Sequence, residues 1–309
     1  MKNVIVTGAN GFIGSTLVNN LLKNGVKVVA IDISFAAPRI PDCDQVVKLE
    51  VGLDNVEKLK VLIPAGEYDA MYHLAWAGVN GPSKADPAVQ LNNIQLGINC
   101  AQLCKAISVK KLLCAGTVAE QAVHSLPNLT QTSGGMMYGV AKHCAHLMLE
   151  DYCKNIGLLF VWMQFSNIYG VGNKTGNLVS YTLGELLKGN EATFGPAAQP
   201  YDFIYVDDLQ EAVYRLGASE TPKACYYIGS GSPRILKEYL LKIGELAGMQ
   251  DKVGIGIRPD DGIKYNFSMF DTTPLKDAIG DYVSTPFEKG IKKTINWLKR
   301  NNNDNKIQF

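Results

Sequence analysis

A tyrosine and a lysine, Tyr138 and Lys142, stand four residues apart in a Tyr-Gly-Val-Ala-Lys segment. In a helix this spacing places both side chains on one face, where the lysine ammonium favours the ionised form of the phenol. Such a pair can transfer a proton to or from a substrate hydroxyl. The chain contains 14 tyrosines, so about one such pair is expected by chance from composition alone, and a solvated helix face is the alternative interpretation. The neighbouring segments of the sequence are needed to distinguish a catalytic pair from a solvated helix face.

A glycine-rich turn near the start of the chain indicates a dinucleotide site. It joins an apolar, β-branched run at 4–6 to a segment with helical spacing at 15–22. Gly8 permits a tight turn, Gly11 lets the backbone approach a pyrophosphate, and Gly14 lets the helix pack closely on the strand. The spacing is G-x-x-G-x-x-G rather than G-x-G-x-x-G, and a purely structural turn is the alternative.

Asp32 lies near the end of the next predicted strand, about twenty residues beyond the glycines. A carboxylate at this place accepts hydrogen bonds from the adenosine ribose and repels a 2′-phosphate, which favours NAD over NADP. Two alternatives remain, because an aspartate can also cap a strand end and the nearby Arg39 can pair with a phosphate.

Strand-like and helical segments alternate through the first half of the chain. Further strands are expected at 26–33, 45–50, 71–74, 109–114 and 158–165, and helices at 56–62, 93–107 and 138–154. This alternation predicts an α/β fold with a doubly wound parallel sheet of the Rossmann type. Thr117 follows the 109–114 strand, at the sheet edge where such folds bind ligands.

From about residue 171 onward, glycine, asparagine and proline interrupt shorter elements, which predicts a smaller, loop-rich C-terminal substrate lobe. We therefore expect a dinucleotide-binding domain at 1–170 with a return segment near 202–218. The substrate-binding lobe is expected at 171–309, interleaved with the first, and the active site between the two.

Composition narrows the partners and the compartment. The net charge of +1 disfavours nucleic acid, and the odd number of cysteines, seven without C-x-x-C spacing, favours reduced thiols in the cytoplasm. No apolar run suggests a membrane span or a targeting segment. His143 and His146 lack further ligands arranged with them in the sequence, so we expect no metal site and place both at the surface or an interface.

The order and spacing of these motifs resemble the extended short-chain dehydrogenases/reductases, specifically the NAD-dependent nucleotide-sugar epimerases, dehydratases and reductases. The resemblance runs nearly end to end. Besides the residues above, it rests on the segments 73–75, 167–170, 202–208 and 258–261 and on Asn93.

The resemblance implies hydride transfer at a sugar carbon. Tyr138 is then the proton-transferring group, Lys142 holds the nicotinamide ribose and lowers the pKa of Tyr138, and Thr117 orients the same sugar oxygen. It also implies a homodimer formed by the helices at 93–107 and 138–154, with Met148 and His146 near the contact.

Two sets of binding residues follow from the resemblance. The cofactor is expected to contact Gly8, Asn10, Gly11, Phe12, Ile13, Gly14, Asp32, Leu74, Ala75, Asn93, Tyr138 and Lys142. The nucleotide-diphosphate sugar is expected to contact Thr117, Asn167, Asn177, Leu178 and Arg258. The aspartate that often contacts adenine in this group is replaced by Val51, so we expect backbone groups to recognise the base.

Departures from the family pattern bear on the reaction. Dehydratases of this group carry Asp-Glu directly after the catalytic threonine, whereas Val118 and Ala119 stand here and cannot move protons. Dehydration is therefore disfavoured unless Glu120 substitutes for them.

Two enzymatic readings remain. Asp32 favours a 4-epimerase that holds NAD tightly and acts through a transient 4-keto sugar, which is our first expectation. The segment 119–121 resembles the Ala-Glu-Tyr of some nucleotide-4-keto-sugar reductases, which usually take hydride from NADPH, and this is the alternative. A non-catalytic dinucleotide-binding protein is a remote third reading, because a fold does not fix a function.

Overall fold

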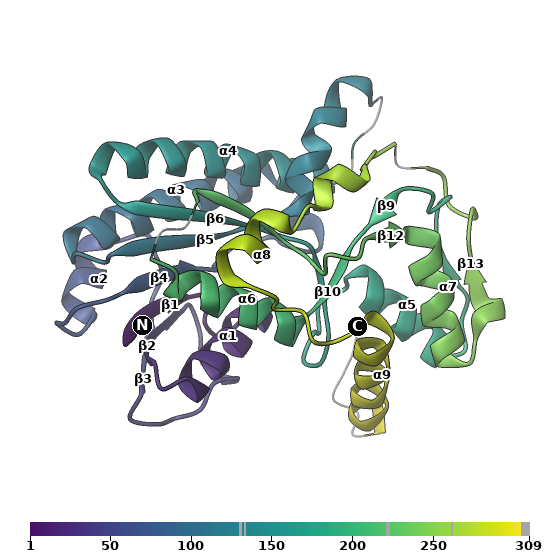
Figure 1. The fold of residues 1–309 in the computed structure, drawn as a ribbon, viewed down its shortest axis with the longest axis horizontal. Coiled ribbons are helices and arrows are strands. Elements are labelled where there is room, and N and C mark those ends of the chain that lie inside the picture. Colours follow the sequence, from purple (N-terminus) through teal and green to yellow (C-terminus); the bar gives the residue numbers. More distant parts are fainter. Residues whose placement is uncertain (130–131, 133, 221–222, 261, 304–309) are drawn as a thin grey trace.

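A seven-stranded parallel sheet forms the larger part of the molecule (Figure 1). The computed structural model describes residues 1–129, 132, 134–220, 223–260 and 262–303. In spatial order the strands are β11 (Cys225–Ile228), β6 (Leu159–Phe165), β5 (Lys111–Thr117), β4 (Ala70–His73), β1 (Asn3–Thr7), β2 (Lys27–Asp32) and β3 (Val46–Glu50). Every neighbouring pair is parallel. The order reverses beside β1, so the predicted doubly wound fold is confirmed.

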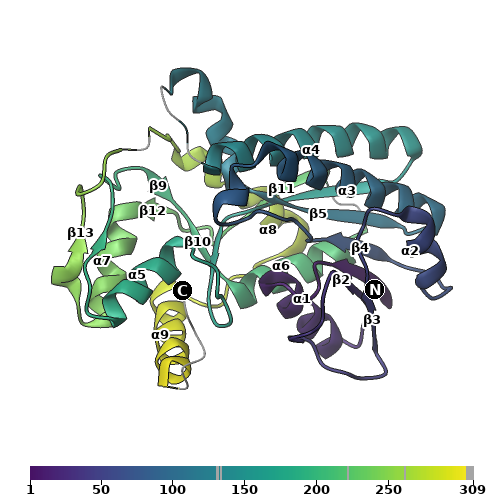
Figure 2. The ribbon, with the colours of Figure 1, turned by 180° about the vertical axis from the view of Figure 1, so that it is seen from behind.

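Helices cover both faces of this sheet (Figures 1 and 2). One face carries α1 (Phe12–Lys23), α6 (Val206–Ala218) and α8 (Thr273–Ile279), and the other carries α2 (Val56–Leu62), α3 (Pro87–Ala106) and α4 (Gly134–Ile156). Side-chain alternation along β1 explains the two layers. Val4 and Val6 pack into the cluster that contains Leu17 of α1, whereas Ile5 packs into the cluster that contains Leu103 of α3.

Two predicted helix starts were too late. The helix expected from residue 93 begins at Pro87, after Asp86, whose carboxylate accepts a hydrogen bond from the Ala88 amide at 2.8 Å. Proline in the first turn after a capping aspartate is a recognised start signal that periodicity alone overlooks. The helix expected from Tyr138 begins at Gly134, so Tyr138 lies inside its second turn.

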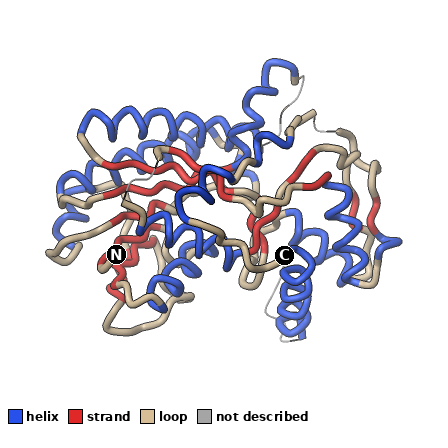
Figure 3. The backbone as a smooth tube through the Cα atoms, viewed as in Figure 1, coloured by secondary structure: helices blue, strands red, loops and turns tan. Residues whose placement is uncertain are grey.

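The second lobe is built from short strand pairs and three helices around a third apolar cluster (Figure 3). The pairs are β7 (Asn167–Tyr169) with β10 (Phe203–Tyr205), β9 (Pro200–Tyr201) with β12 (Arg234–Ile235), and β8 (Ala192–Thr193) with β13 (Val253–Gly254). The helices are α5 (Leu178–Leu187), α7 (Leu236–Ala247) and α9 (Phe287–Asn303). Short 3₁₀ turns are η1 (Pro82–Lys84), η2 (Val118–Asn128), η3 (Gln250–Lys252) and η4 (Phe267–Phe270).

The chain passes between the lobes more than once. It leaves the sheet after β6, returns with α6 inside the expected 202–218 segment, and returns again with β11 and α8, which lie outside that segment. None of the helices in the described ranges combines the length and apolar composition that a bilayer span requires.

Candidate active site

A cavity of about 1010 Å³ lies at the carboxyl ends of the sheet strands and is lined by both lobes. Parallel α/β sheets bind ligands at this edge because several strand ends converge there. Most of the expected site residues line it: Gly8, Asn10, Gly11, Phe12, Ile13, Gly14, Asp32, Leu74, Ala75, Asn93, Tyr138, Asn167, Asn177 and Leu178. Thr117, Lys142 and Arg258 are not part of the lining.

The glycine turn fits a pyrophosphate. Gly8 has φ +67°, and a Cβ there would lie 2.7 Å from the Ala75 nitrogen. A Cβ on Gly14 would lie 2.0 Å from the Gly8 carbonyl oxygen, so only glycine allows α1 to begin this close to β1. Gly11 caps α1 without any side-chain hydrogen bond, so backbone N–H groups at the positive helix end would be available to an anion.

Asp32 stands at the end of β2 on the cavity wall. Its carboxylate accepts hydrogen bonds from the backbone N–H groups of Asn10 and Ile33, both at 2.8 Å. These bonds fix its orientation beside the glycine turn, where a ribose would lie. Arg39 is exposed and is not part of the cavity lining, so its side chain does not offset this carboxylate at the cavity wall.

Asp54 is a cavity residue that the sequence reasoning missed. It lines the cavity together with Val51, Gly52 and Leu53, directly after β3. The sequence signal for it is an acidic residue three positions after Val51. The segment therefore offers a carboxylate as well as backbone groups to a bound base.

Tyr138 lies in the cavity wall with its ring edge-on to Trp76, at 6.3 Å between centroids. Burial raises the pKa of Tyr138 above its ordinary value, and the Glu120 charge adds to this, while a hydrogen bond with Thr117 lowers the pKa. The sequence analysis expected Lys142 to lower the pKa of Tyr138, but in the protein without cofactor the effect of burial is larger. The reason is geometric, since Lys142 Nζ lies 5.9 Å from the phenol ring centroid and donates elsewhere.

Lys142 is almost fully buried behind the cavity wall. Its Nζ donates to the Ala115 carbonyl at 2.6 Å and lies 3.6 Å from the ring centroid of Trp76. Burial lowers the pKa of Lys142 to about 7, against the opposing charge of Glu120. Trp76 lines the cavity and lies between it and the Lys142 ammonium. No role was predicted for Trp76 from the sequence, although it is an aromatic residue directly after the His-Leu-Ala motif.

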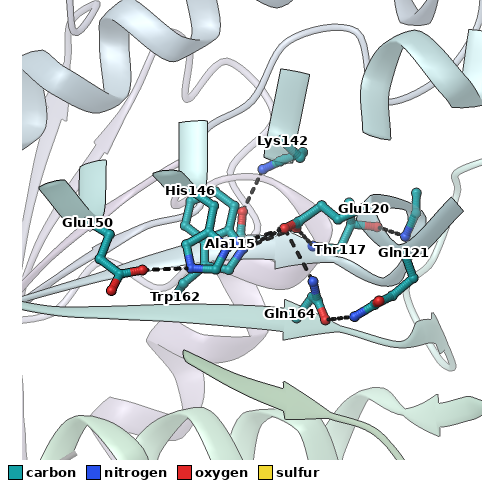
Figure 4. Close-up of polar contacts among 10 residues, drawn as sticks. Ala115, Thr117, Glu120, Gln121, Lys142, His146, Glu150, Trp162 and Gln164 are labelled. Atoms are coloured by element: carbon teal, nitrogen blue, oxygen red, sulfur yellow. Dashed lines mark hydrogen bonds and ion pairs between the residues drawn. The ribbon is translucent and has the colours of Figure 1, made fainter. Parts of the chain in front are cut away.

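Thr117 ends β5 and begins η2, where a capping box holds it (Figure 4). Its hydroxyl accepts a hydrogen bond from the Ala119 N–H at 3.2 Å, and Glu120 accepts one from the Thr117 N–H at 2.7 Å. The first bond orients the threonine side chain and the second orients its backbone. From this position Thr117 lowers the pKa of Tyr138.

Glu120 is buried and turned away from the cavity, which its side chain does not line. Its carboxylate also accepts hydrogen bonds from Trp162 Nε1 at 3.1 Å and from Gln164 Nε2 at 3.3 Å (Figure 4). With its oxygens engaged in this network, Glu120 does not supply the acid and base that a dehydratase needs beside the threonine.

His146 was expected at the surface or an interface, and the structure contradicts the first of these two places. Its ring stacks on Trp162 with 4.9 Å between centroids, and only 13% of the side chain is exposed. Its two nitrogens lie 3.6 Å from Glu120 and 3.5 Å from Glu150 (Figure 4). Glu150 lies one turn further along α4, an i, i+4 spacing that the sequence shows, whereas Glu120 comes from η2 and only the fold brings it to His146. The described residues contain no group of three or more ligands able to hold a metal ion.

The expected substrate residues lie on the second-lobe side. Asn167 accepts a hydrogen bond from the Tyr201 hydroxyl at 3.0 Å, and Asn177 caps α5 by accepting one from the Ser180 N–H at 2.9 Å. Arg258 lies outside the cavity lining and is exposed; it donates to the Tyr181 hydroxyl at 2.5 Å. The structure therefore brings Asn167 and Asn177 together with Tyr138 but does not bring Arg258 to them.

Known proteins resemble this chain over nearly its whole length. A putative UDP-glucose 4-epimerase of Methanocaldococcus jannaschii is 24% identical over 313 residues, covering 97% of this chain and 99% of that protein. A UDP-glucuronate 4-epimerase of Thermodesulfobacterium geofontis is 25% identical over 320 residues, covering 97% of each.

Solved structures agree with the fold. The Bordetella bronchiseptica enzyme WbmF, in complex with NAD⁺ and UDP, superposes with a TM-score of 0.80 at 25% identity, covering 98% of this chain and 94% of that one. The family model described as "NAD dependent epimerase/dehydratase family" matches residues 4–229. The predicted family, its enzymatic character and its NAD cofactor are confirmed. This chain belongs to the NAD-dependent epimerase/dehydratase family.

Proposed function

We propose that this protein is an NAD-dependent nucleotide-sugar 4-epimerase that acts through a transient 4-keto sugar. One observation carries the proposal. Tyr138 lines the same cavity as the glycine turn and Asp32, and Thr117 lowers its pKa. Among the described residues, the acid beside this threonine is Glu120, which is buried in a hydrogen-bonded network and does not line the cavity. The set is complete for proton transfer at a hydroxyl and lacks the groups for eliminating water.

Each residue has a distinct task in this proposal. The glycine turn and Asp32 would hold NAD, which would supply reversible hydride transfer at the sugar carbon. Tyr138 takes the proton of the sugar hydroxyl and returns it to the ketone oxygen. Thr117 is proposed to orient that oxygen. Lys142 is proposed to leave the Ala115 carbonyl and the Trp76 ring when the cofactor binds, so that it holds the nicotinamide ribose and supplies positive charge near the phenol.

The substrate is held from the second lobe. Asn167, Asn177 and Leu178 are proposed to contact the sugar or its diphosphate, because they line the cavity opposite the dinucleotide turn. Arg258 is proposed to reach the diphosphate by leaving the Tyr181 hydroxyl, which a long exposed side chain can do.

The relatives support a nucleotide sugar as substrate. Two of them are described as UDP-sugar 4-epimerases, and WbmF was solved with NAD⁺ and UDP. The ketoreductase is the second candidate. It is weaker, because Asp32 faces the ribose position and disfavours the 2′-phosphate of NADPH.

Two finer points are part of the proposal. A homodimer would form through α3 and α4, which carry exposed apolar side chains at Leu91, Leu147 and Met148.

A cytoplasmic location suits the seven free cysteines, since thiols persist in reducing compartments.

The function is tested with purified protein and its Tyr138→Phe variant. We expect the wild type to release stoichiometric NAD on denaturation and to interconvert UDP-sugars that differ at C4 without added reductant. Tyr138→Phe should lose turnover by about 10³-fold, because the proton-transferring hydroxyl is gone, while still retaining NAD. Protein that is purified empty and consumes NADPH with a 4-keto nucleotide sugar would establish the reductase instead. Retained epimerisation in Tyr138→Phe would remove the proposed role of Tyr138.

A further inference from the structure

Lys84 has no task in the reaction described above, yet it is part of the catalytic cavity. It ends the η1 turn, lines the cavity and is half-buried. Its Nζ lies over the ring of Tyr138, 5.2 Å from the ring centroid. Within the described residues that line the cavity, Lys84 is the one lysine or arginine, and Asp32 and Asp54 are the acidic residues.

Within the described part of the chain, the ammonium of Lys84 has no anionic partner. Among the residues that the structure describes, no carboxylate lies within 4.0 Å of its Nζ, whereas the partly buried Lys48 and the exposed Lys110 do have such partners. Burial lowers the pKa of Lys84 below its ordinary value. A partly desolvated cation without a partner is costly, and a ligand anion would offset that cost.

The backbone that carries Lys84 is held firmly. The buried Gln90 amide donates to the carbonyl oxygens of Gly78 at 3.1 Å, Ser83 at 3.2 Å and Lys84 at 3.4 Å. Gln90 also accepts a hydrogen bond from Trp76 Nε1 at 2.9 Å. The η1 turn is therefore tied to the same amide as the aromatic wall of the site, and Lys84 is anchored relative to Tyr138.

The chemistry of a hexose decides which anion fits this place. The Tyr138 hydroxyl marks the reacting carbon, C4. The diphosphate leaves the sugar at C1, across the ring from C4, whereas the C6 substituent is attached to the neighbouring carbon, C5. An ammonium over the Tyr138 ring is therefore better placed for a carboxylate at C6 than for the diphosphate.

We propose that Lys84 binds a carboxylate that the sugar carries next to the reacting carbon, so that the preferred substrates are nucleotide-linked hexuronates. This inference rests on the proposed function, because it takes Tyr138 to act at C4. It adds a specificity-determining residue and a substrate class, and it accounts for the lysine that the hydride chemistry leaves unused.

The test compares UDP-glucuronate with UDP-glucose in the NAD-loaded enzyme. We expect the wild type to have the higher kcat/KM for UDP-glucuronate. Lys84→Met should lower the ratio of the two kcat/KM values roughly 10- to 100-fold, which is the usual size of a charge-assisted hydrogen bond. Lys84→Arg should restore part of the ratio. Lys58→Met removes an equal charge from an exposed position of α2 and should leave the ratio unchanged.

Competitive inhibition provides a readout that does not depend on the turnover of UDP-glucuronate itself. UDP-glucuronate should inhibit wild-type turnover of UDP-glucose more strongly than it inhibits Lys84→Met. Equal losses for both sugars, or weaker NAD retention in Lys84→Met, would overturn the inference and assign Lys84 to a phosphate shared by both reactions. A wild type that epimerises UDP-glucose but ignores UDP-glucuronate would overturn the inference alone, whereas no 4-epimerisation of either sugar would contradict the proposed function.

Discussion

The Lys142 ammonium is almost fully buried, and its contacts within the protein offset only part of the free-energy cost of removing a charge from water. The Ala115 carbonyl and the Trp76 ring contact its ammonium, while Glu120 acts from a distance. Burial nevertheless dominates and lowers the pKa of Lys142 to about 7. A cation held in this balance changes its charge near neutral pH, which suits a residue that must respond to a bound cofactor.

This balance predicts a pH dependence of stability. The pKa of Lys142 lies at about 7 in the folded protein against 10.5 for the free side chain, so between these values the unfolded chain binds a proton that the folded protein does not. The contribution of Lys142 to the free energy of unfolding therefore rises with pH in this window. From pH 7 to pH 9 the wild type should gain about 2 kcal/mol relative to Lys142→Met.

The measurement is urea unfolding of nucleotide-free protein at both pH values. Lys58→Met, on the exposed side of α2, serves as the charge control and should track the wild type. A difference between wild type and Lys142→Met that stays constant from pH 7 to pH 9 would contradict the depressed pKa.

At the scale of elements, the join between β1 and α1 limits what the site tolerates. The helix begins so close to the strand that Gly14 faces the Gly8 carbonyl without room for any side chain. This contact sets where the helix N-terminus, with its free N–H groups, meets the cavity. Stability and cofactor binding therefore depend on the same glycine.

Gly14→Ala should weaken NAD binding at least tenfold and destabilise the fold by about 3 kcal/mol, because its Cβ would lie 2.0 Å from a backbone oxygen. The matched control is Gly66→Ala, whose Cβ would meet nothing within 4 Å. That control should change stability by no more than about 0.5 kcal/mol. Thermal unfolding measures the stability of the two variants, and titration with NAD measures their affinity for it. Equal stability and equal NAD affinity of the two variants would contradict this role of Gly14.

At the scale of the whole molecule, the cavity exists because the chain alternates between two lobes. The sheet supplies the cofactor wall, while Asn177 and Leu178 at the start of α5 face it from the second lobe. Asn177 ties its own helix to β7 by donating to the Ile168 carbonyl at 2.7 Å. The opposite wall is thereby attached to a strand that directly follows β6 of the main sheet.

The proposed dimer makes a prediction at this scale. Leu147 and Met148 are about half exposed on α4, and burying such side chains against a second copy would stabilise an assembly. Introducing charges with Leu147→Glu and Met148→Glu should reduce the solution mass from a dimer to a monomer by light scattering. Val61→Glu, at an even more exposed position on α2, should leave the mass unchanged. A wild type that is already monomeric would rule the dimer out.

The features that the sequence by itself determined are local ones. The glycines of the first turn, Asp32 at the end of a strand, and the helical spacing of Tyr138 and Lys142 depend on conformational preferences within one or two turns of chain. For the same reason the alternation of strands and helices was enough to predict the parallel sheet.

Other features were decided only by tertiary structure, because they depend on residues far apart in the chain. Glu120 turns from the cavity because Trp162, some forty residues later, donates to it. Trp76 covers Lys142, Lys84 reaches the Tyr138 ring, and Arg258 is held outside the cavity, all through contacts between separate elements. Periodicity and motif spacing carry no information about such pairings, since side-chain direction across elements is set by packing.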